Sequence, residues 1–222
     1  MCIRTYFLAA LLICVGLFGG AAWADSIAVT NGTFGETSGP FTPCGTGCEY
    51  TNGSIPGWTA TGFTGSFEPG GYLNSPLPGG GTFVGYTNGG TLTQDLGVGL
   101  TPDTFYTLGV EVGNRLDGTS GAYTIALMDG STTLCSFSGN SDTITSGDFA
   151  EETCSFTTGS SVPSGDITIF LTGGSSGTQF DFDDVTVTTP EPASATLLTV
   201  GLFFVILIGG LYNRRQAFRT AL

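Results

Sequence analysis

The sequence contains no histidine and no lysine among its 222 residues, and these two absences exclude several kinds of active site. Without histidine there is no Ser-His-Asp triad and no HExxH zinc site. Without lysine there is no Walker A phosphate loop and no Schiff base. All five basic residues are arginines, and with 18 acidic residues they give a formal net charge of −13, the wrong sign for binding nucleic-acid phosphates. Chemistry in this chain is therefore limited to carboxylates, aromatic rings, hydroxyls and metal ions.

The first 24 residues have the pattern of a secretory signal peptide. Arg4 supplies the positive start, residues 6–20 form an apolar run, and Ala22-Trp23-Ala24 is an A-x-A cleavage site. An N-terminal membrane anchor is the weaker alternative, because the apolar run is short and the small-residue site follows it directly. We therefore expect residues 1–24 to be removed on export.

A second apolar segment lies near the C-terminus. Residues 193–211 carry no charge, and as a helix they would be about 28 Å long, close to the hydrocarbon thickness of a bilayer. A basic end at 212–222 follows, and positive residues favour the cytoplasmic side, so the acidic part of the chain is expected outside. A buried core helix is the alternative, but such a helix has an apolar stripe rather than apolar residues all round.

Three ordered features make up the tail: a Pro-Glu-Pro motif, the hydrophobic span and a terminal arginine pair. The residues are Pro190, Glu191, Pro192, Arg214 and Arg215. This order resembles the PEP-CTERM sorting signal of bacteria that make exopolysaccharide. The resemblance implies that residues 189–222 are a sorting tail, which an exosortase-type membrane protease cuts near the Pro-Glu-Pro. It also implies a protein anchored in the membrane by its C-terminal span and then released to the cell envelope or the exterior.

The segment between the two ends, residues 25–188, has the composition of one exported domain. It holds 17 of the 18 acidic residues, one base (Arg115) and 31 of the 37 glycines. Short runs with period-two alternation of apolar residues, such as 106–112, 123–127 and 167–171, are separated by Gly, Ser and Thr clusters. This pattern is typical of strands joined by turns. We therefore predict an all-β domain, a two-sheet sandwich or jelly roll.

Two local features predict turns or irregularities in this domain. Segments 82–87 and 91–96 flank Asn88-Gly89-Gly90, which predicts a β-hairpin. Further on, the two phenylalanines of residues 180–187 share one parity and the two valines share the other. A regular strand cannot point both pairs inward, so a β-bulge is expected at residues 183–184.

Four cysteines remain after signal removal: Cys44, Cys48, Cys135 and Cys154. An even number in an exported domain predicts disulfides, and the pairing 44–48 with 135–154 closes one tight loop and one longer loop. A Cys₄ zinc site is the alternative, but the second pair lacks the usual C-x₂-C spacing.

The bulge brings carboxylates together, and hard oxygen ligands of this kind suit Ca²⁺. We predict a structural calcium site at Asp183 or Asp184, with Glu36 as partner; the alternative is a charged strand edge without metal. Three short motifs carry a resemblance to the galactose-binding-like β-sandwich of carbohydrate-binding modules. They are Asn31-Gly32-Thr33-Phe34, Pro56-Gly57-Trp58 and Phe182-Asp183-Asp184-Val185. In that family an acid after the N-terminal Phe joins the C-terminal Asp at calcium, whereas here Gly35 holds that position and Glu36 comes one later.

Aromatic side chains are the candidate ligand-binding residues. Trp58, Tyr72 and Tyr86 are the candidates for a sugar platform, with Tyr50 in similar Gly-rich surroundings. The structural alternative is that each has only a packing role; it is the stronger alternative for all of them, and most of all for Trp58.

These observations favour a non-catalytic protein of the bacterial envelope or extracellular matrix, with exopolysaccharide as its candidate ligand. A structural surface protein with no specific ligand is the second hypothesis. A carboxylate-dependent polysaccharide hydrolase or lyase is the third, and no pair of acids stands out for that chemistry.

Overall fold

The structure is a computed structural model that describes residues 24–45, 47–118, 121–174 and 177–190. No helix in these ranges is long and apolar enough to cross a membrane. The predicted signal peptide and the predicted span at 193–211 lie outside the described ranges, and so do Glu191, Pro192, Arg214 and Arg215 of the sorting motif.

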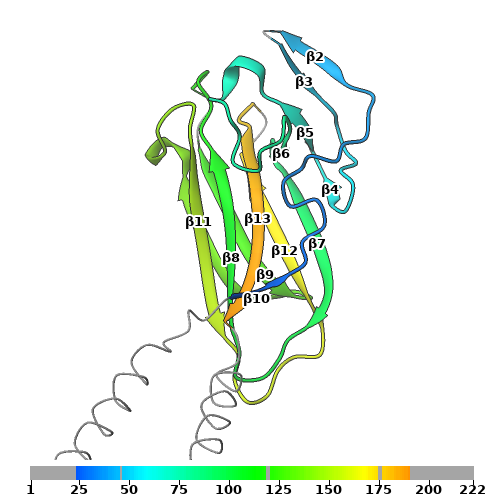
Figure 1. The fold of residues 1–222 in the computed structure, drawn as a ribbon, viewed down its shortest axis with the longest axis vertical. Coiled ribbons are helices and arrows are strands. Elements are labelled where there is room, and N and C mark those ends of the chain that lie inside the picture. The colour runs from blue at the N-terminus through cyan, green and yellow to red at the C-terminus, as the bar shows by residue number, and fades with distance from the viewer. Residues whose placement is uncertain (1–23, 46, 119–120, 175–176, 191–222) are drawn as a thin grey trace, which may run out of the picture. The chain divides into compact units, whose positions relative to one another are not determined.

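The described chain is an all-β sandwich of two sheets that face each other, as predicted (Figure 1). The larger sheet has eight strands, and the seven along its main path pair antiparallel. Their order is β11 (Phe149–Thr157), β8 (Phe105–Gly113), β13 (Phe180–Pro190), β6 (Val84–Thr87), β5 (Thr64–Glu68), β3 (Cys48–Tyr50) and β2 (Thr42–Gly45), with β1 (Ala24–Ile27) paired to β13.

The smaller sheet has five antiparallel strands. Their order is β10 (Thr132–Asn140), β9 (Ala122–Asp129), β12 (Asp166–Gly173), β7 (Gly90–Gly99) and β4 (Thr59–Thr61). Two short 3₁₀ helices, η1 (Gly70–Tyr72) and η2 (Ser141–Thr143), complete the described elements.

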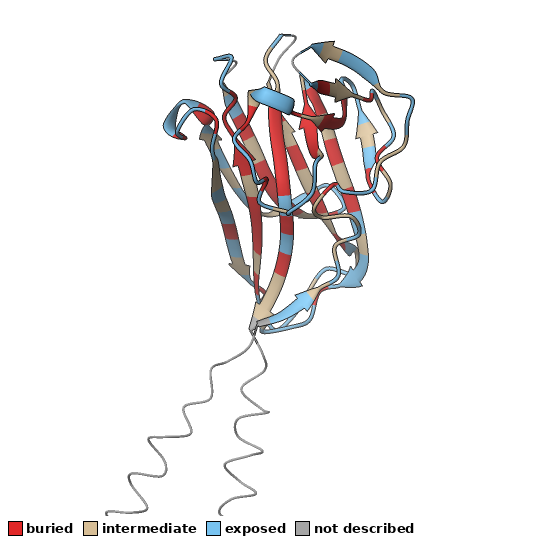
Figure 2. Ribbon diagram, turned by 45° about the horizontal axis from the view of Figure 1, so that its top comes forward, coloured by how far each residue is buried: buried red, intermediate tan, exposed pale blue. Residues whose placement is uncertain are grey.

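Alternate residues of the central strands fill the space between the sheets. In β8, β9 and β12 every second side chain is apolar and buried, as the alternation predicted, and Figure 2 shows this as red stripes along the strands. The residues are Tyr106, Leu108, Val110, Val112, Tyr123, Ile125, Leu127, Ile167, Ile169 and Leu171. Burial of each such side chain contributes roughly 1.5–3 kcal/mol, so this core holds the two sheets face to face.

A second, smaller cluster covers part of the outer face of the eight-stranded sheet. On β13, Phe180 and Phe182 point into the main core, so Asp181 between them points outward. Its partner on β6 is Tyr86, which belongs to the second cluster. The cluster consists of Cys48, Phe67, Leu73, Leu77, Val84 and Tyr86. The segment between β5 and β6, which contains η1, therefore covers this part of the sheet.

The predicted hairpin around Asn88 is wrong, because the two strands belong to different sheets. β6 pairs with β5 and β13, whereas β7 pairs with β4 and β12. The Asn-Gly-Gly sequence does make a turn, with φ +78° at Gly89, but the turn carries the chain from one sheet to the facing one. A local turn signal does not reveal which of these two connections the chain makes.

The predicted bulge at residues 183–184 is confirmed. The register between β13 and β8 shifts between Asp183 and Thr186, and Asp184 has φ +43°. As a result Phe182 and Val185 are both buried in the core despite their opposite parity.

Both predicted disulfides are confirmed. Cys44–Cys48 closes the β2–β3 hairpin, with 5.3 Å between the Cα atoms. Cys135–Cys154 joins β10 to β11, the edge strands of the two sheets, with 5.7 Å between the Cα atoms. All four cysteines are therefore used, which excludes the zinc alternative.

The three motifs that resemble a carbohydrate-binding sandwich meet in one place. The N–H of Val185 donates to the carbonyl of Gly32 (2.9 Å), and the Phe34 and Trp58 rings stack with centroids 5.1 Å apart. The indole N–H of Trp58 donates to the carbonyl of Asn31 (3.1 Å). These contacts fasten the chain after β1 to the bulge of β13, which is a structural role.

Candidate functional site

A cavity of about 280 Å³ lies beside the second cluster, on the outer face of the eight-stranded sheet. It is lined by Cys44, Tyr50, Asn52, Phe63, Phe67, Tyr72, Tyr86, Asn88, Arg115 and Gln179. Half of these side chains are aromatic, and most of the others are polar or charged. Its size is close to the lower end for small-molecule sites, and aromatic walls with a few polar groups are typical of them.

Asp181 lies in a row of five residues that crosses the sheet. The strand register aligns Gly65, Tyr86, Asp181, Gly113 and Phe149, on β5, β6, β13, β8 and β11 respectively. A Cβ on Gly113 would lie 2.9 Å from the Phe149 ring and 3.4 Å from the Cβ of Asp181. Glycine at this position therefore leaves room for both neighbouring side chains on the same face.

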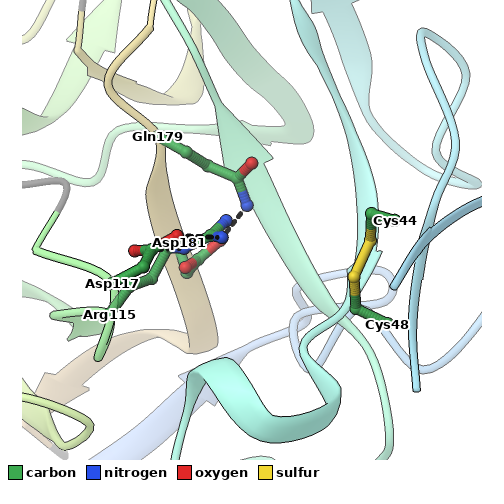
Figure 3. The surroundings of a disulfide bond; sticks show 6 residues. All are labelled: Cys44, Cys48, Arg115, Asp117, Gln179 and Asp181. Carbon is green, nitrogen blue, oxygen red and sulfur yellow. Dashed lines mark hydrogen bonds and ion pairs between the residues drawn. A yellow bond between two sulfur atoms is a disulfide. The ribbon is translucent and has the colours of Figure 1, made fainter. Parts of the chain in front are cut away.

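The Asp181 side chain is completely buried, and only one of its two oxygens is satisfied. The amide Nε2 of Gln179 donates to Oδ1 at 2.8 Å, whereas Oδ2 has no hydrogen-bond partner among the described residues (Figure 3). Burial raises the pKa of Asp181 to about 6, although the charge of Arg115 and the Gln179 hydrogen bond both act to lower it. Asp181 can therefore exchange a proton near neutral pH.

Arg115 is the only basic residue in the described part of the chain, and it sits on the cavity wall. Its Nη2 and Nε donate to the two carboxylate oxygens of Asp117, at 2.7 Å and 3.2 Å. The guanidinium carbon lies 4.8 Å from the ring centre of Phe67 and 4.5 Å from that of Tyr72. The ion pair and the two rings hold Arg115 in place, because a guanidinium is attracted to both carboxylates and aromatic faces.

Tyr86 presents its ring to the cavity, but its hydroxyl is already committed. The hydroxyl lies 2.6 Å from Oδ1 of Asn52 and 2.9 Å from the carbonyl oxygen of Thr51, and both of these atoms are acceptors. Burial first, then the charges of Tyr50 and Asp181, raise the pKa of Tyr86 to about 12. Tyr86 therefore contributes an aromatic wall rather than an acid or base at neutral pH.

The residues predicted to bind calcium do not form a carboxylate cluster. Among the described residues no group of three or more His, Cys, Asp or Glu side chains is placed to hold a metal. Asp183 is buried, and its Oδ2 and Oδ1 accept from the backbone N–H groups of Gly79 and Asp184, both at 2.8 Å. Asp184 and Glu36 are exposed. The calcium site stays a prediction. Both oxygens of Asp183 already accept a hydrogen bond from a backbone N–H group.

Comparison with known proteins shows the family to which this chain belongs. The model of the HpiC1-like family, described as HpiC1 cyclase, matches residues 25–188. The chain belongs to the HpiC1-like cyclase family. No curated protein matches the chain.

Solved structures of cyclases share the fold of this HpiC1-like chain. One is the Stig cyclase Fisc from Fischerella sp. TAU, in complex with (3Z)-3-(1-methyl-2-pyrrolidinylidene)-3H-indole. It is 25% identical with a TM-score of 0.62, over 77% of this chain and 100% of that one. Another is an apo cyclase from Fischerella sp., 26% identical with a TM-score of 0.63, over 76% of this chain and 98% of that one.

The prediction of a non-catalytic protein is wrong, because the HpiC1-like family is a family of cyclases. The polysaccharide-hydrolase and structural-protein alternatives fail for the same reason. The wrong prediction was based on the sequence of the tail and on the acidic composition. Features of this kind bear on the location of a protein and carry no information about the activity of its cavity.

The predicted aromatic candidates fall in two places in this HpiC1-like domain. Tyr72 and Tyr86 lie on the cavity wall together with Tyr50, whereas Trp58 is buried in the core against Phe34. Tyr50 lies on β3 and Tyr86 on β6. The prediction that these aromatic residues bind a ligand is not tested by their positions.

Sequence reasoning missed seven residues at or next to this cavity: Asn52, Phe63, Phe67, Asn88, Arg115, Gln179 and Asp181. One signal was available for Arg115. It is the only base in a strongly acidic domain, so it could be expected to pair with an acid and to have a specific role. For Asp181, the alternation of residues 180–182 correctly points the acid away from the core. Nothing in that alternation reveals that a loop covers the other face.

Proposed function

We propose that the chain is an exported cyclase that closes a ring in a small, planar nitrogen heterocycle, with Asp181 as the proton donor. Membership of the HpiC1-like cyclase family supports the reaction class. The ligand named in the Fisc complex, an indole joined to a pyrrolidine ring, supports the substrate class. The observation that carries the proposal is a buried acid with an unpartnered oxygen, directly behind the wall of an aromatic cavity.

Asp181 is suited to donate a proton to a ligand in this cavity. Two of the wall residues adjoin it: Gln179, to which it is hydrogen-bonded, and Tyr86, its partner in the strand register. A carboxyl group with a pKa of about 6 is partly protonated near neutral pH and still gives up its proton readily.

The proposed reaction is an isomerisation and needs no co-reactant. Asp181 gives its proton to a basic or electron-rich atom of the substrate, which leaves a positive charge on the substrate and a carboxylate on the enzyme. An electron pair from one part of the substrate forms the new ring bond to the cationic centre. Loss of a proton from the cyclised cation to the carboxylate restores neutral product and protonated Asp181.

The cavity walls favour a cationic intermediate over an anionic one. The rings of Tyr50, Phe63, Phe67, Tyr72 and Tyr86 offer negative faces to a positive charge. The one positive group on the wall, Arg115, is paired with Asp117, so the two charges largely cancel. Once Asp181 has lost its proton, the site gains a negative charge that stabilises the cation formed by the transfer.

The test uses the full chain, purified in detergent, with indoles that carry an unsaturated side chain as substrates. Ring closure gives a product of unchanged mass and altered chromatographic retention. Asp181→Asn should lower the rate by about 10²–10⁴-fold, the usual contribution of a general acid. Asp129→Asn is the matched control, since Asp129 is also buried with an unpartnered oxygen but lies on the other sheet. Wild-type rates for Asp181→Asn would overturn the proposal.

The export part of the proposal rests on the sequence of the two ends. A cleaved signal peptide, a single C-terminal span and processing near the Pro-Glu-Pro by an exosortase-type protease would place the domain in the envelope or outside the cell. The two disulfides support an oxidising compartment. Protease added to intact spheroplasts should digest the domain, and protection of the domain would contradict this part.

A further inference from the structure

We infer that Arg115 determines which ligands this cavity accepts, by donating hydrogen bonds to an uncharged acceptor, a carbonyl oxygen. The inference rests on the proposed function only in taking this cavity as the substrate site. Arg115 is the one base among residues 25–188, and its side chain is only 10% exposed although it lies on the cavity wall. A buried guanidinium is costly unless its donors are used, so the partner of each donor matters.

Part of the Arg115 guanidinium has no partner in the described chain. Of the five N–H donors of a guanidinium, Arg115 uses two on Asp117, one from Nε and one from Nη2 (Figure 3). The two N–H groups of Nη1 and the second N–H of Nη2 form no hydrogen bond with any residue that the structure describes. Nη1 retains contact with open space, and because the side chain is nine-tenths buried on the cavity wall, that space is the cavity.

The surroundings of Arg115 hold these N–H groups in place. The N–H of Leu116, the next residue, donates to the carbonyl of Tyr72 at 2.9 Å, which ties the segment after β8 to the cavity wall. The guanidinium carbon lies over the rings of Phe67 and Tyr72, and Asp117 fixes the plane of the group through its two hydrogen bonds. The donors are therefore oriented before a ligand binds, which lowers the entropy lost on binding.

The charge of Arg115 is already matched, which is why we expect the acceptor to be neutral. Asp117 lies 2.7 Å away, and residues 25–188 carry 17 acidic residues against this one base. A ligand carboxylate would be repelled by Asp117 and by the net charge of the domain. An ammonium group would offer the guanidinium no acceptor. A carbonyl oxygen accepts the remaining N–H groups without adding charge, and the five aromatic rings of the wall would pack against a planar ring system that carries it.

The test compares four indoles as ligands of the full chain in detergent, by calorimetric titration. They are 3-acetylindole, which has a carbonyl; 3-ethylindole, which lacks only that oxygen; indole-3-carboxylate; and tryptamine, which carries an ammonium group. The wild type should bind 3-acetylindole about tenfold or more tightly than 3-ethylindole, as expected for a hydrogen bond from a charged donor, and more tightly than the other two. Equal affinity for 3-acetylindole and 3-ethylindole, or tightest binding of the acid or the amine, would overturn the inference.

Two variants assign this preference to Arg115. Arg115→Met keeps an unbranched side chain over the two rings but has no N–H donor, so the preference for 3-acetylindole over 3-ethylindole should disappear. Arg115→Lys keeps the charge without the planar fork and should lower the preference several-fold, which covers the case in which Arg115→Met does not fold. Phe63→Ala is the matched control: this exposed wall residue should weaken binding of both indoles and leave their ratio unchanged.

The affinity ratio separates this role from a purely structural one. If Arg115 only held the loop through Asp117, its replacement would lower Tm and leave the ratio between 3-acetylindole and 3-ethylindole as in the wild type. An unchanged ratio in whichever Arg115 variant folds would therefore overturn the inference. That outcome leaves the cyclase proposal standing, because the latter depends on the turnover of Asp181→Asn and not on the affinity of these four ligands.

Discussion

Asp181 and Asp183 are both fully buried on the same face of β13, yet only Asp183 has hydrogen-bond donors on both of its oxygens. Asp181 has a donor on Oδ1 alone, and its Oδ2 is unpartnered in the described structure. Burial raises the pKa of each carboxyl to about 6. The two acids therefore have similar pKa values. Replacing Asp183 would affect two hydrogen-bond donors, whereas replacing Asp181 would affect only one.

Replacing Asp181 by asparagine should stabilise the protein at pH 8 and not at pH 4. The folded state holds the Asp181 proton up to about pH 6, whereas the unfolded chain releases it near the ordinary value of 3.8. Stability from this group is therefore lost as the pH rises from about 4 to 6, and it stays low above that. The difference is on the order of 3 kcal/mol, or several degrees in Tm. Thermal unfolding at the two pH values measures it.

Asp183→Asn serves as the comparison in that experiment. Its carboxylate accepts two backbone N–H groups, and an asparagine would turn an N–H₂ group towards one of them. The gain from removing a buried charge is offset by this clash of donors. If Asp183→Asn stabilised the protein at pH 8 as much as Asp181→Asn did, the prediction would be wrong, because the difference in hydrogen bonding would then have no effect on stability.

Two phenylalanines on the cavity wall should separate binding from stability. Phe63 is 65% exposed, so Phe63→Ala should change the free energy of unfolding by less than about 0.5 kcal/mol. It should weaken binding of the indole–pyrrolidine compound by roughly tenfold, the loss of one aromatic contact. Phe67 is 2% exposed and packs in the second cluster, so Phe67→Ala should cost about 3–5 kcal/mol of stability. Calorimetric titration measures the loss of binding, and thermal melts measure the loss of stability. Equal destabilisation by Phe63→Ala and Phe67→Ala would contradict this prediction.

The two disulfides should also have different effects when removed. Cys135–Cys154 closes a loop with a sequence separation of 19 and Cys44–Cys48 one of 4, so the chain-entropy model predicts losses of about 3 and 2 kcal/mol. Cys44 lies on the cavity wall, so the double Ser variant at 44 and 48 should also weaken ligand binding. The double Ser variant at 135 and 154 should lower Tm and leave binding to the folded protein unchanged. The reverse pattern would show that the hairpin of β2 and β3 is not part of the site.

The calcium prediction can be checked without any substrate. If a structural site exists at Asp183, Asp184 and Glu36, Ca²⁺ at a hundredfold excess over Kd should add about 2.7 kcal/mol of stability. Asp184→Ala should abolish most of that gain, and Mg²⁺ should do less because it keeps its water. Melting curves that coincide in EDTA and in millimolar Ca²⁺ would show that no calcium site exists here. These acids would then only form a charged strand edge and accept backbone hydrogen bonds at the bulge.

Local pattern was enough to predict much of the sandwich. Alternation at residues 106–112, 123–127 and 167–171 predicted β8, β9 and β12, because a strand that buries one face must place apolar residues at every second position. The parity break at 183–184 predicted the bulge for the same reason. The hairpin at Asn88 was wrong, since a tight turn can join strands of one sheet or of two facing sheets.

The all-β class, the period-two core and the disulfide pairing could be predicted from the sequence, because each depends on residue spacing or on a count. The folded structure was needed to show that Tyr86, Asp181, Gln179 and Arg115 gather beside one cavity. These residues come from segments up to 95 positions apart, and the outer face of β13 becomes a buried site only because the segment between β5 and β6 folds over it. The raised pKa of Asp181 follows from that burial, and burial by a distant segment leaves no trace in the local alternation.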